Sequence, residues 1–417
     1  MIRALLIAAC AMLSIGQARA DDVLHFGERP SWATEIAEPA PGTFDGAITV
    51  RLMTMQLRYD DSGTHQVTRQ IMRVNTPEGL QMAGTIYVIW QPTIGKMTVN
   101  RVLIHRGAET IDVMKDGKGF QILRRESQLE SAMINGMLTA VLQVPDLRVG
   151  DEIELAYTTD MSNPVLAGHA ETAIPLDVLP SSDRLTVKVS WPIGRTVRWM
   201  AGPLAPAPVL TKAGGFQIAT LTRDDWKKPE APASAPDRYS RMAMVQFSDF
   251  ASWDAVSGLM RPLFETAATI TPDSPVMAEV KRIAAMSNDP KIRATEALRT
   301  VQSQVRYLAR VDGLGAYKPE AADAVWSGRS GDCKGKTVLL LSMLHALGIT
   351  ADPALVSATD GDGVDAALPM PGRFNHVIVR AVIDGKVYWL DGTRFGDGNI
   401  DRIAVPEFRW ALPLEAQ

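Results

Sequence analysis

Hydrophobic and polar residues alternate along much of the chain between about residues 43 and 247, with the period of two that is typical of half-buried β-strands. Leu185, Val187 and Val189, for example, alternate with Thr186 and Lys188. Turn-forming residues separate the β-rich runs, which lie near 48–59, 64–74, 84–90, 96–104, 138–144, 153–157 and 185–191. Many short strands with regular turns predict an antiparallel β-sandwich.

The hydrophobic period becomes helical after about residue 248. Helices are predicted over 275–286, from 290 onward and over 333–347, and strands near 353–358, 373–383 and 386–393. We therefore predict an α+β protein, in which a β-rich sandwich-type domain over 21–248 precedes an α+β core over 249–417. The segment 229–236, rich in Pro and Ala, is expected to be a linker or a long surface loop.

Residues 1–20 have the pattern of a secretory signal peptide. An apolar stretch follows Arg3, and Ala18-Arg19-Ala20 fits a cleavage site. That stretch is shorter than the roughly 20 residues that span a bilayer, and no later segment reaches this length. We expect cleavage after Ala20, a periplasmic or secreted protein, and no transmembrane segment in the mature chain. A lipoprotein anchor at Cys10 is disfavoured because it would leave only nine residues of signal.

The composition excludes several classes of protein. Of the 417 residues, 46% are hydrophobic and 22% are charged, which is enough apolar material to bury a core and argues against disorder. The net charge of −4 argues against a general nucleic-acid binder. The two cysteines exclude a disulfide scaffold, and only Cys333 remains after the signal is removed. In an exported protein such a lone thiol is either buried and inert or retained for its chemistry.

The residues around Cys333 favour chemistry. Asp332 is a suitable N-cap, which puts Cys333 at the first position of a leucine-rich helix. Unpaired backbone N–H groups and the helix dipole favour an anion there, and Lys334 and Lys336 add positive charge. Such surroundings activate thiols for nucleophilic attack. The alternative interpretation is a small residue at the start of a buried helix.

A catalytic thiol needs an imidazole partner, and the chain has six histidines. Four lie in the β-rich region and are each expected to stand alone: His25, His65, His105 and His169. His345 shares the helix of Cys333 and is expected on its solvated side. His376, which precedes an apolar strand, is therefore the predicted partner.

A hairpin connects His376 with an acidic residue. Asp384-Gly385 between two β-rich runs predicts a two-residue turn. In that register His376 faces Thr393, and Asp391 is its diagonal neighbour on the same face, close enough for their side chains to meet. Asp391 would then hold the imidazole in one tautomer. The alternative is an ordinary cross-strand polar pair, and a one-residue slip would put the two side chains on opposite faces.

Three motifs in this order resemble the transglutaminase-like family: Gly331-Asp332-Cys333-Lys334, Phe374-Asn375-His376-Val377 and Tyr388-Trp389-Leu390-Asp391-Gly392-Thr393. The resemblance covers about residues 260–400 and implies a papain-like α+β fold with a Cys-His-Asp triad. It makes Cys333 the nucleophile, His376 the general base and acid, and Asp391 the residue that orients His376.

The β-rich region resembles the uncharacterised β-rich domain that precedes such cores in exported bacterial proteins. The matching parts are Leu123-Arg124-Arg125-Glu126, Val144-Pro145-Asp146-Leu147-Arg148-Val149-Gly150-Asp151 and Asn163-Pro164.

The chain departs from the family pattern at two positions outside the triad. Gly335 stands where relatives usually have an acidic residue, and Gly392 where they have proline; both departures weaken the transfer of detailed specificity. For the oxyanion, the backbone N–H of Cys333 is one natural donor. The sequence does not choose a second donor among Gln304, Tyr307 and Trp326.

Other motifs add little. Asp360-Gly361-Asp362 and the segment 397–401 resemble parts of calcium loops but lack the remaining EF-hand ligands, so both are expected to be solvated turns. We find neither zinc spacing nor a phosphate-binding glycine loop, and we expect no metal and no cofactor. The segment 358–372 is either a mobile loop at the rim of the cleft or a plain connector.

We therefore predict an exported cysteine-dependent acyl-transfer enzyme that acts on a protein or peptide substrate through a thioester. Hydrolysis is modestly favoured over amine transfer, because water is the default acceptor when no amine site is visible. The alternative is a non-catalytic module that binds an envelope protein through the β-rich domain and uses the core as a scaffold.

Overall fold

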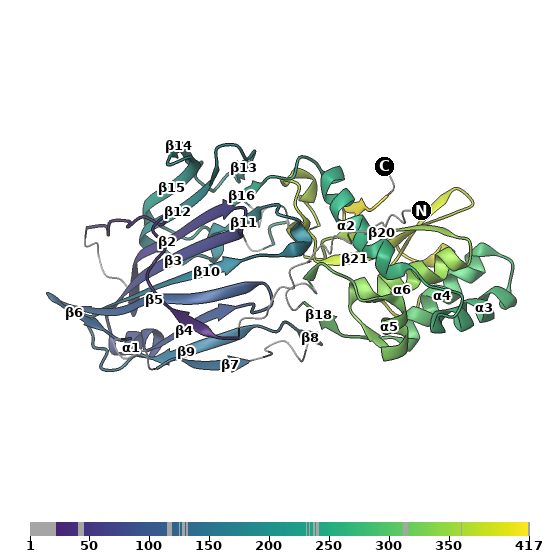
Figure 1. The fold of residues 1–417 in the computed structure, drawn as a ribbon, viewed down its shortest axis with the longest axis horizontal. Helices are drawn as coiled ribbons and strands as arrows, with labels where there is room; N and C mark the ends of the chain where they lie inside the picture. Colours follow the sequence, from purple (N-terminus) through teal and green to yellow (C-terminus); the bar gives the residue numbers. More distant parts are fainter. Residues whose placement is uncertain are drawn as a thin grey trace, which may run out of the picture.

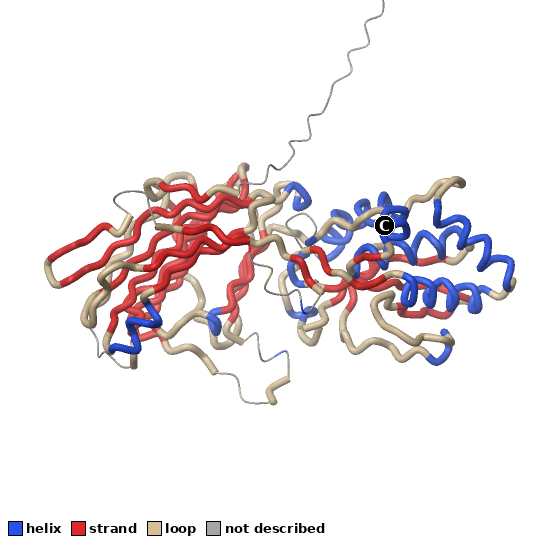
Figure 2. Tube along the Cα trace, turned by 90° about the horizontal axis from the view of Figure 1, so that it is seen from below, coloured by secondary structure: helices blue, strands red, loops and turns tan. Residues whose placement is uncertain are grey.

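The computed structural model describes residues 22–40, 46–114, 119–124, 126, 130, 132–230, 232, 234–236, 238, 242–311, 316–359 and 361–415. The predicted signal peptide with its Ala20 cleavage site and Cys10 lies outside these residues, as do Arg125 and Asp360. Strands gather at one end of the molecule and helices at the other (Figures 1 and 2). The predicted α+β class is thereby confirmed.

The largest sheet has nine strands, with β6 beside β5 at one edge. In sheet order its strands are β1 (Leu24–Phe26), β5 (Gly95–Arg106), β10 (Glu152–Met161), β3 (Gly63–Val74), β2 (Ile48–Asp60), β12 (Ser182–Pro192), β15 (Phe216–Trp226) and β14 (Val209–Ala213), with β6 at Glu109–Asp112. The predicted pairing was wrong at two places, because β1 runs parallel to β5 and β12 runs parallel to β2. Parallel neighbours need a long connection, and the chain supplies one between β2 and β12.

Two smaller sheets cover the apolar face of the large sheet and form a sandwich with it. Their strands are β4 (Thr85–Trp90), β9 (Leu138–Gln143) and β7 (Gln121–Arg124) in one, and β11 (Glu171–Pro175), β16 (Met244–Ser248) and β13 (Arg198–Ala201) in the other. Trp90 and Ile86 pack against Val99 and Ile153 in the first core. Phe247 packs with Trp191 in the second core. Helix α1 (Pro77–Ala83) connects β3 with β4.

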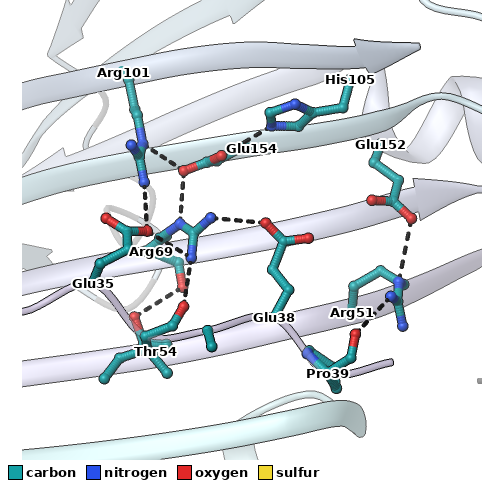
Figure 3. A network of polar contacts seen from close by, with 12 residues as sticks. Glu35, Glu38, Pro39, Arg51, Thr54, Arg69, Arg101, His105, Glu152 and Glu154 are labelled. Atoms are coloured by element: carbon teal, nitrogen blue, oxygen red, sulfur yellow. Dashed lines mark hydrogen bonds and ion pairs between the residues drawn. The ribbon is translucent and has the colours of Figure 1, made fainter. Parts of the chain in front are cut away.

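The opposite face of the large sheet carries charged side chains, which the segment 34–40 covers (Figure 3). Glu154 is only 2% exposed and accepts hydrogen bonds from Arg69 at 2.7 Å and from His105 at 3.0 Å. Arg69 also contacts Glu38 at 3.1 Å and the Ile36 carbonyl at 3.0 Å. A buried charge is tolerated only when it is paired, so this network is what allows a polar face to be covered.

The helical end contains the sheet β22 (Lys386–Leu390), β21 (His376–Ile383), β20 (Thr350–Val356) and β23 (Ala411–Pro413). Its helices are α2 (Trp253–Ala268), α3 (Pro275–Met286), α4 (Pro290–Gln304), α5 (Ala322–Gly328) and α6 (Cys333–Ala346). Helix α6 lies against β20 and β21 and is buried from Cys333 to Leu344. It is the centre of this core.

Short strand pairs connect separate parts of the chain. β17 (Arg306–Tyr307) pairs with β19 (Ser330–Gly331), and β18 (Ala309–Arg310) pairs with β8 (Met133–Ile134). The second pair joins the helical end to the β-rich end, and β8 and β18 lie at their junction in Figure 1. The described residues of the segment 229–236 lie in a loop between β15 and β16. Among the described residues no helix is long and apolar enough to cross a membrane.

Candidate active site

Helix α6 begins where the sequence predicts. The Asp332 side chain accepts a hydrogen bond from the Gly335 backbone N–H at 2.8 Å, so Asp332 is the N-cap and Cys333 is the first helical residue. The first N–H groups of a helix have no partner within the helix and point towards its N-terminal end. Cys333 is 7% exposed. A rigid, buried helix therefore holds the thiol beside several N–H dipoles.

The predicted hairpin turn and its register are confirmed. Ile383 pairs with Lys386 and Val379 with Leu390, so Asp384 and Gly385 form the two-residue turn. Both have positive φ, 52° and 76°, as a type I′ turn requires. The ladder ends at Leu390, and the chain then continues past Asp391 to Thr393.

This register brings His376 and Asp391 together. His376 Nε2 lies 3.0 Å from Asp391 Oδ2, and the other oxygen of that carboxylate accepts hydrogen bonds from the Thr393 N–H at 2.8 Å and hydroxyl at 2.7 Å. Gln302 donates to the Asp391 carbonyl at 3.0 Å. The carboxylate is thus held at both oxygens. The ring of Phe408 packs edge-on against His376, with 5.4 Å between the ring centroids.

The third predicted residue, Cys333, lies next to the same imidazole. Burial lowers the pKa of His376, but hydrogen bonds to Asp391 and Cys333 outweigh it and raise the pKa to about 9. Burial raises the pKa of Asp391, but hydrogen bonds from His376 and Thr393 hold it below its usual range. The geometry therefore favours a charged pair of His376 and Asp391 at neutral pH.

A hydrogen bond fixes the helix to the strand that carries the histidine. The Thr337 hydroxyl, on the second turn of α6, donates to the Val377 carbonyl of β21 at 3.1 Å. Val377 directly follows His376. This bond helps to hold the helix that carries the thiol against the strand that carries the imidazole.

The two lysines do not act as the sequence suggests. Lys334 forms an ion pair with the N-cap Asp332, so its charge is compensated locally. Lys336 is fully buried, and its Nζ donates to the Val305 carbonyl at 2.6 Å. Burial lowers the pKa of Lys336 to about 8, although the Asp391 carboxylate opposes this effect. Lys336 therefore connects α6 to the end of α4 through this hydrogen bond.

Packing explains the two glycines that depart from the family pattern. A Cβ at Gly335 would lie 2.9 Å from Val325 Cγ2, so a larger residue would have to displace the Val325 side chain of α5. A Cβ at Gly392 would lie 3.3 Å from Val301 and 3.4 Å from the Lys336 side chain. Both positions are closely packed against neighbouring helices, and this packing accounts for glycine at each.

A cavity of about 270 Å³ opens beside the thiol and includes Cys333 and His376 in its lining. Tyr307 also lines it, whereas Gln304 accepts a hydrogen bond from Arg329 and Trp326 stacks on the Arg329 guanidinium. Burial and the nearby Cys333 and Asp332 raise the pKa of Tyr307 to about 12. Of the three candidate oxyanion donors, the structure brings Tyr307 to the cavity.

Part of the segment 358–372 lines the same cavity, namely Pro371 and Gly372. This placement favours the interpretation that the segment lies at the rim of the cleft over the interpretation that it is only a connector. The mobility of the segment stays a prediction.

Three histidines of the β-rich region have polar partners in the structure, so the expectation that each stands alone was wrong for His65, His105 and His169. His105 contacts Glu154, and His169 contacts Asp249. His65 lies between Asp160 at 2.6 Å and Ser62 at 2.9 Å. These partners come from distant strands, which local sequence does not reveal.

Ser62, His65 and Asp160 are the three residue types of a serine hydrolase triad, but their hydrogen bonds do not suit catalysis. The single hydroxyl proton of Ser62 is directed at Asp60, 2.5 Å away, so His65 can only donate to Ser62 and cannot remove its proton. We interpret this cluster as the cap of the β2–β3 turn. No group of three or more His, Cys, Asp or Glu residues in the described part of the chain is arranged to hold a metal ion.

Comparison with known proteins supports the fold. Residues 60–230 match the family model DUF3857, described as a domain of unknown function with a solved structure. The match covers less than half of the chain and agrees with the resemblance of the β-rich region to an uncharacterised domain. No curated protein matches the chain at a significant level.

Among solved structures, a "putative protease" from Parabacteroides distasonis is similar in fold. It has a TM-score of 0.64 at 14% identity, and the match covers 83% of this chain and 67% of that one. An M1 zinc metallopeptidase from Deinococcus radiodurans has a TM-score of 0.25 at 12% identity, covering 49% and 42% of the two chains. Legionella pneumophila aminopeptidase A in complex with aspartic acid has a TM-score of 0.27 at 9% identity, covering 50% and 22%. The last two scores are too low to carry an argument.

The Asp391→Asn substitution should lower the pKa of His376 from about 9, because burial still disfavours the charged ring while the carboxylate that favours it is gone. The folded-state pKa lies above the value of about 6.5 for a free imidazole. The stabilising contribution is therefore full below about pH 6.5 and is lost as the pH rises through about 9.

The measurement is an NMR titration of the His376 ring in wild type and Asp391→Asn, with urea unfolding at pH 6 and pH 10. The wild type should exceed the variant in free energy of unfolding by more at pH 6 than at pH 10. Asp401→Asn, at an exposed aspartate that bonds Lys291 and Tyr388, is the control and should leave the titration unchanged. An unaltered His376 titration in Asp391→Asn would show that the carboxylate does not act on the imidazole.

Proposed function

We propose that this protein is a cysteine-dependent acyl-transfer enzyme with a transglutaminase-like core, which hydrolyses peptide or carboxamide bonds through a thioester. The observation that carries the proposal is the imidazole of His376, held by Asp391 at Nε2 and adjacent to the Cys333 thiol. With Nε2 occupied, Nδ1 is the nitrogen left for the sulfur. A thiol, an imidazole and an orienting carboxylate in this relation are the parts of a nucleophilic site.

The first half of the reaction is acylation. Cys333 sulfur attacks the substrate carbonyl carbon, and the carbonyl oxygen becomes an oxyanion. The imidazolium of His376 then donates its Nδ1 proton to the leaving nitrogen as the C–N bond breaks. The product amine departs, and the acyl group stays on Cys333 as a thioester.

The second half of the reaction resolves the thioester. A water molecule loses a proton to the now neutral His376 and attacks the thioester carbon, and the C–S bond breaks to release the carboxylic acid. The thiolate of Cys333 and the imidazolium of His376 are restored together. Asp391 stabilises the imidazolium at the start of each cycle, which is the role that its hydrogen bond suits.

Two donors are available to the oxyanion. The backbone N–H of Cys333 is at the first position of α6, where it has no partner within the helix. We assign the second donor to the Tyr307 hydroxyl, which belongs to the lining of the cavity beside Cys333 and carries its proton at neutral pH. Both would stabilise the charge that develops in the transition state.

Replacing Tyr307 with Phe should therefore lower kcat by about 10²-fold or more, which is the usual cost of losing one oxyanion donor, and should change KM little. Gln304→Ala is the matched control and should retain the wild-type kcat. Steady-state kinetics on a peptide amide provides the measurement. A Tyr307→Phe enzyme with wild-type kcat, or a comparable loss in Gln304→Ala, would reassign the donor.

The acyl acceptor should be water. Casein incubated with the protein and a fluorescent primary amine should release new termini or ammonia in a reaction that Cys333→Ser abolishes. Incorporation of the amine into casein should stay far below this release. Cys333-dependent incorporation that exceeds hydrolysis would identify the protein as an amine transferase instead. The absence of any Cys333-dependent product, whether hydrolysed or amine-labelled, would contradict enzymatic activity on these bonds.

A further inference from the structure

The cavity beside Cys333 is mostly apolar. The larger apolar side chains in its lining come from five parts of the chain and include Met133, Met260, Phe264, Val311, Leu355 and Phe374. Its charged residues are already paired, since Lys334 bonds Asp332 and His376 bonds Asp391. Its volume of about 270 Å³ lies just under the range of roughly 300–1,000 Å³ for pockets that hold whole small ligands. This size suits a single large side chain or two small ones.

One wall of the cavity belongs to the β-rich region. Met133 lies on β8, which pairs in parallel with β18. The Ala309 N–H donates to the Ala132 carbonyl at 2.8 Å, and the Val311 N–H donates to the Ile134 carbonyl at 3.0 Å. These main-chain bonds on both sides of Met133 fix its backbone relative to the helical end, so its side chain is a built part of the lining.

A second element of the β-rich region holds another part of the lining. Glu171, at the start of β11, accepts hydrogen bonds from the Tyr317 hydroxyl at 3.0 Å and from the Gly372 N–H at 3.2 Å. Tyr317 and Gly372 both line the cavity. A Cβ at Gly372 would lie 2.9 Å from the Glu171 carboxylate oxygen, so glycine is what lets the carboxylate approach.

Two further bonds tie the same part of the lining to strand β16. The Leu368 N–H donates to the Gln246 side chain at 3.1 Å, and the Ser248 hydroxyl donates to the Pro369 carbonyl at 2.6 Å. The segment 368–374 leads directly into His376. The β-rich region therefore positions a wall of the cavity and the approach to the imidazole together.

We propose that this cavity binds an apolar side chain of the substrate next to the scissile carboxamide, and that the β-rich region forms this specificity pocket through Met133 and through the bonds of Glu171. The inference rests on the proposed role of Cys333 as nucleophile. Burying an apolar side chain is favourable in proportion to its area, whereas an unpaired charge in the same place is strongly disfavoured. Met133 contacts the substrate side chain in this account, and Glu171 is a positioning residue.

Covalent probes test the pocket without requiring turnover. The chloromethyl ketones of acetyl-Ala-Leu and acetyl-Ala-Asp react with Cys333 when its sulfur displaces chloride and forms a C–S bond. The rate constant of each is divided by that of iodoacetamide in the same variant, which corrects for the reactivity of the thiol. The leucine probe should react at least tenfold faster than the aspartate probe in the wild type.

Variants assign this preference to the β-rich region. Met133→Lys should reduce the leucine-to-aspartate ratio by tenfold or more, because a cation in the lining disfavours an apolar side chain and attracts the aspartate, and the conservative Met133→Leu should keep the ratio. Met82→Lys, at a methionine of α1 that is 60% exposed, is the matched control and should leave the ratio unchanged. Glu171→Ala should slow both peptide probes relative to iodoacetamide, since it releases Tyr317 and Gly372, and Glu171→Gln should retain part of the rate because its amide oxygen can still accept one bond.

A leucine-to-aspartate ratio near one in the wild type, or a ratio that Met133→Lys leaves intact in a protein with a normal circular dichroism spectrum, would overturn the inference. Failure of the proposed catalytic role of Cys333 and His376 would give a different result. Iodoacetamide would then react with Cys333 at the same rate in wild type and His376→Ala, while the ratio of the two peptide probes would still report on the pocket.

Discussion

The register of the β21–β22 hairpin is the constraint on which the candidate site depends. Asp384 and Gly385 both adopt positive φ in a two-residue turn, and this turn determines which residues of the two strands face each other. Because side chains alternate between the faces of a sheet, a shift of one residue would move Asp391 away from His376. The 3.0 Å contact between them is therefore a consequence of the geometry of a turn that begins eight residues after the histidine.

Helix α6 carries Cys333, and the burial of this helix holds the thiol in place. Its residues from Cys333 to Leu344 are buried among α2, α4, α5 and the sheet, which packs the helix against β21. Thr337 and Lys336 bond this helix to Val377 and to the end of α4. A thiol on such an element is positioned by the whole core, which is the preorganisation that nucleophilic catalysis needs.

Local features of the site could be predicted from the sequence, because each depends on neighbours along the chain. Ser274, Asp289 and Asp332 accept hydrogen bonds as helix N-caps, and α3 spans the predicted 275–286. The strand periodicity located most of the large sheet. Helix α2 was missed as a defined element, and Pro262 within it argues against a helix on local grounds. Tertiary packing outweighs that local cost.

The features that could not be predicted join residues far apart in sequence. The parallel pairing of β2 with β12, the burial of Lys336, and the bonds of Glu171 to Tyr317 and Gly372 all depend on the folded arrangement. The sequence pattern divides the chain into a β-rich part and a core. Residues of both parts line or hold the cavity, and none of these contacts could be read from the sequence pattern.

The central claim is that His376 activates Cys333. Its most direct test is the rate of Cys333 alkylation by iodoacetamide at pH 6.5, with mass spectrometry to identify the labelled residue. We predict that His376→Ala reacts at least tenfold more slowly than the wild type, and that His345→Ala, which alters the histidine on the same helix, reacts at the wild-type rate. Equal rates in wild type and His376→Ala would contradict the account.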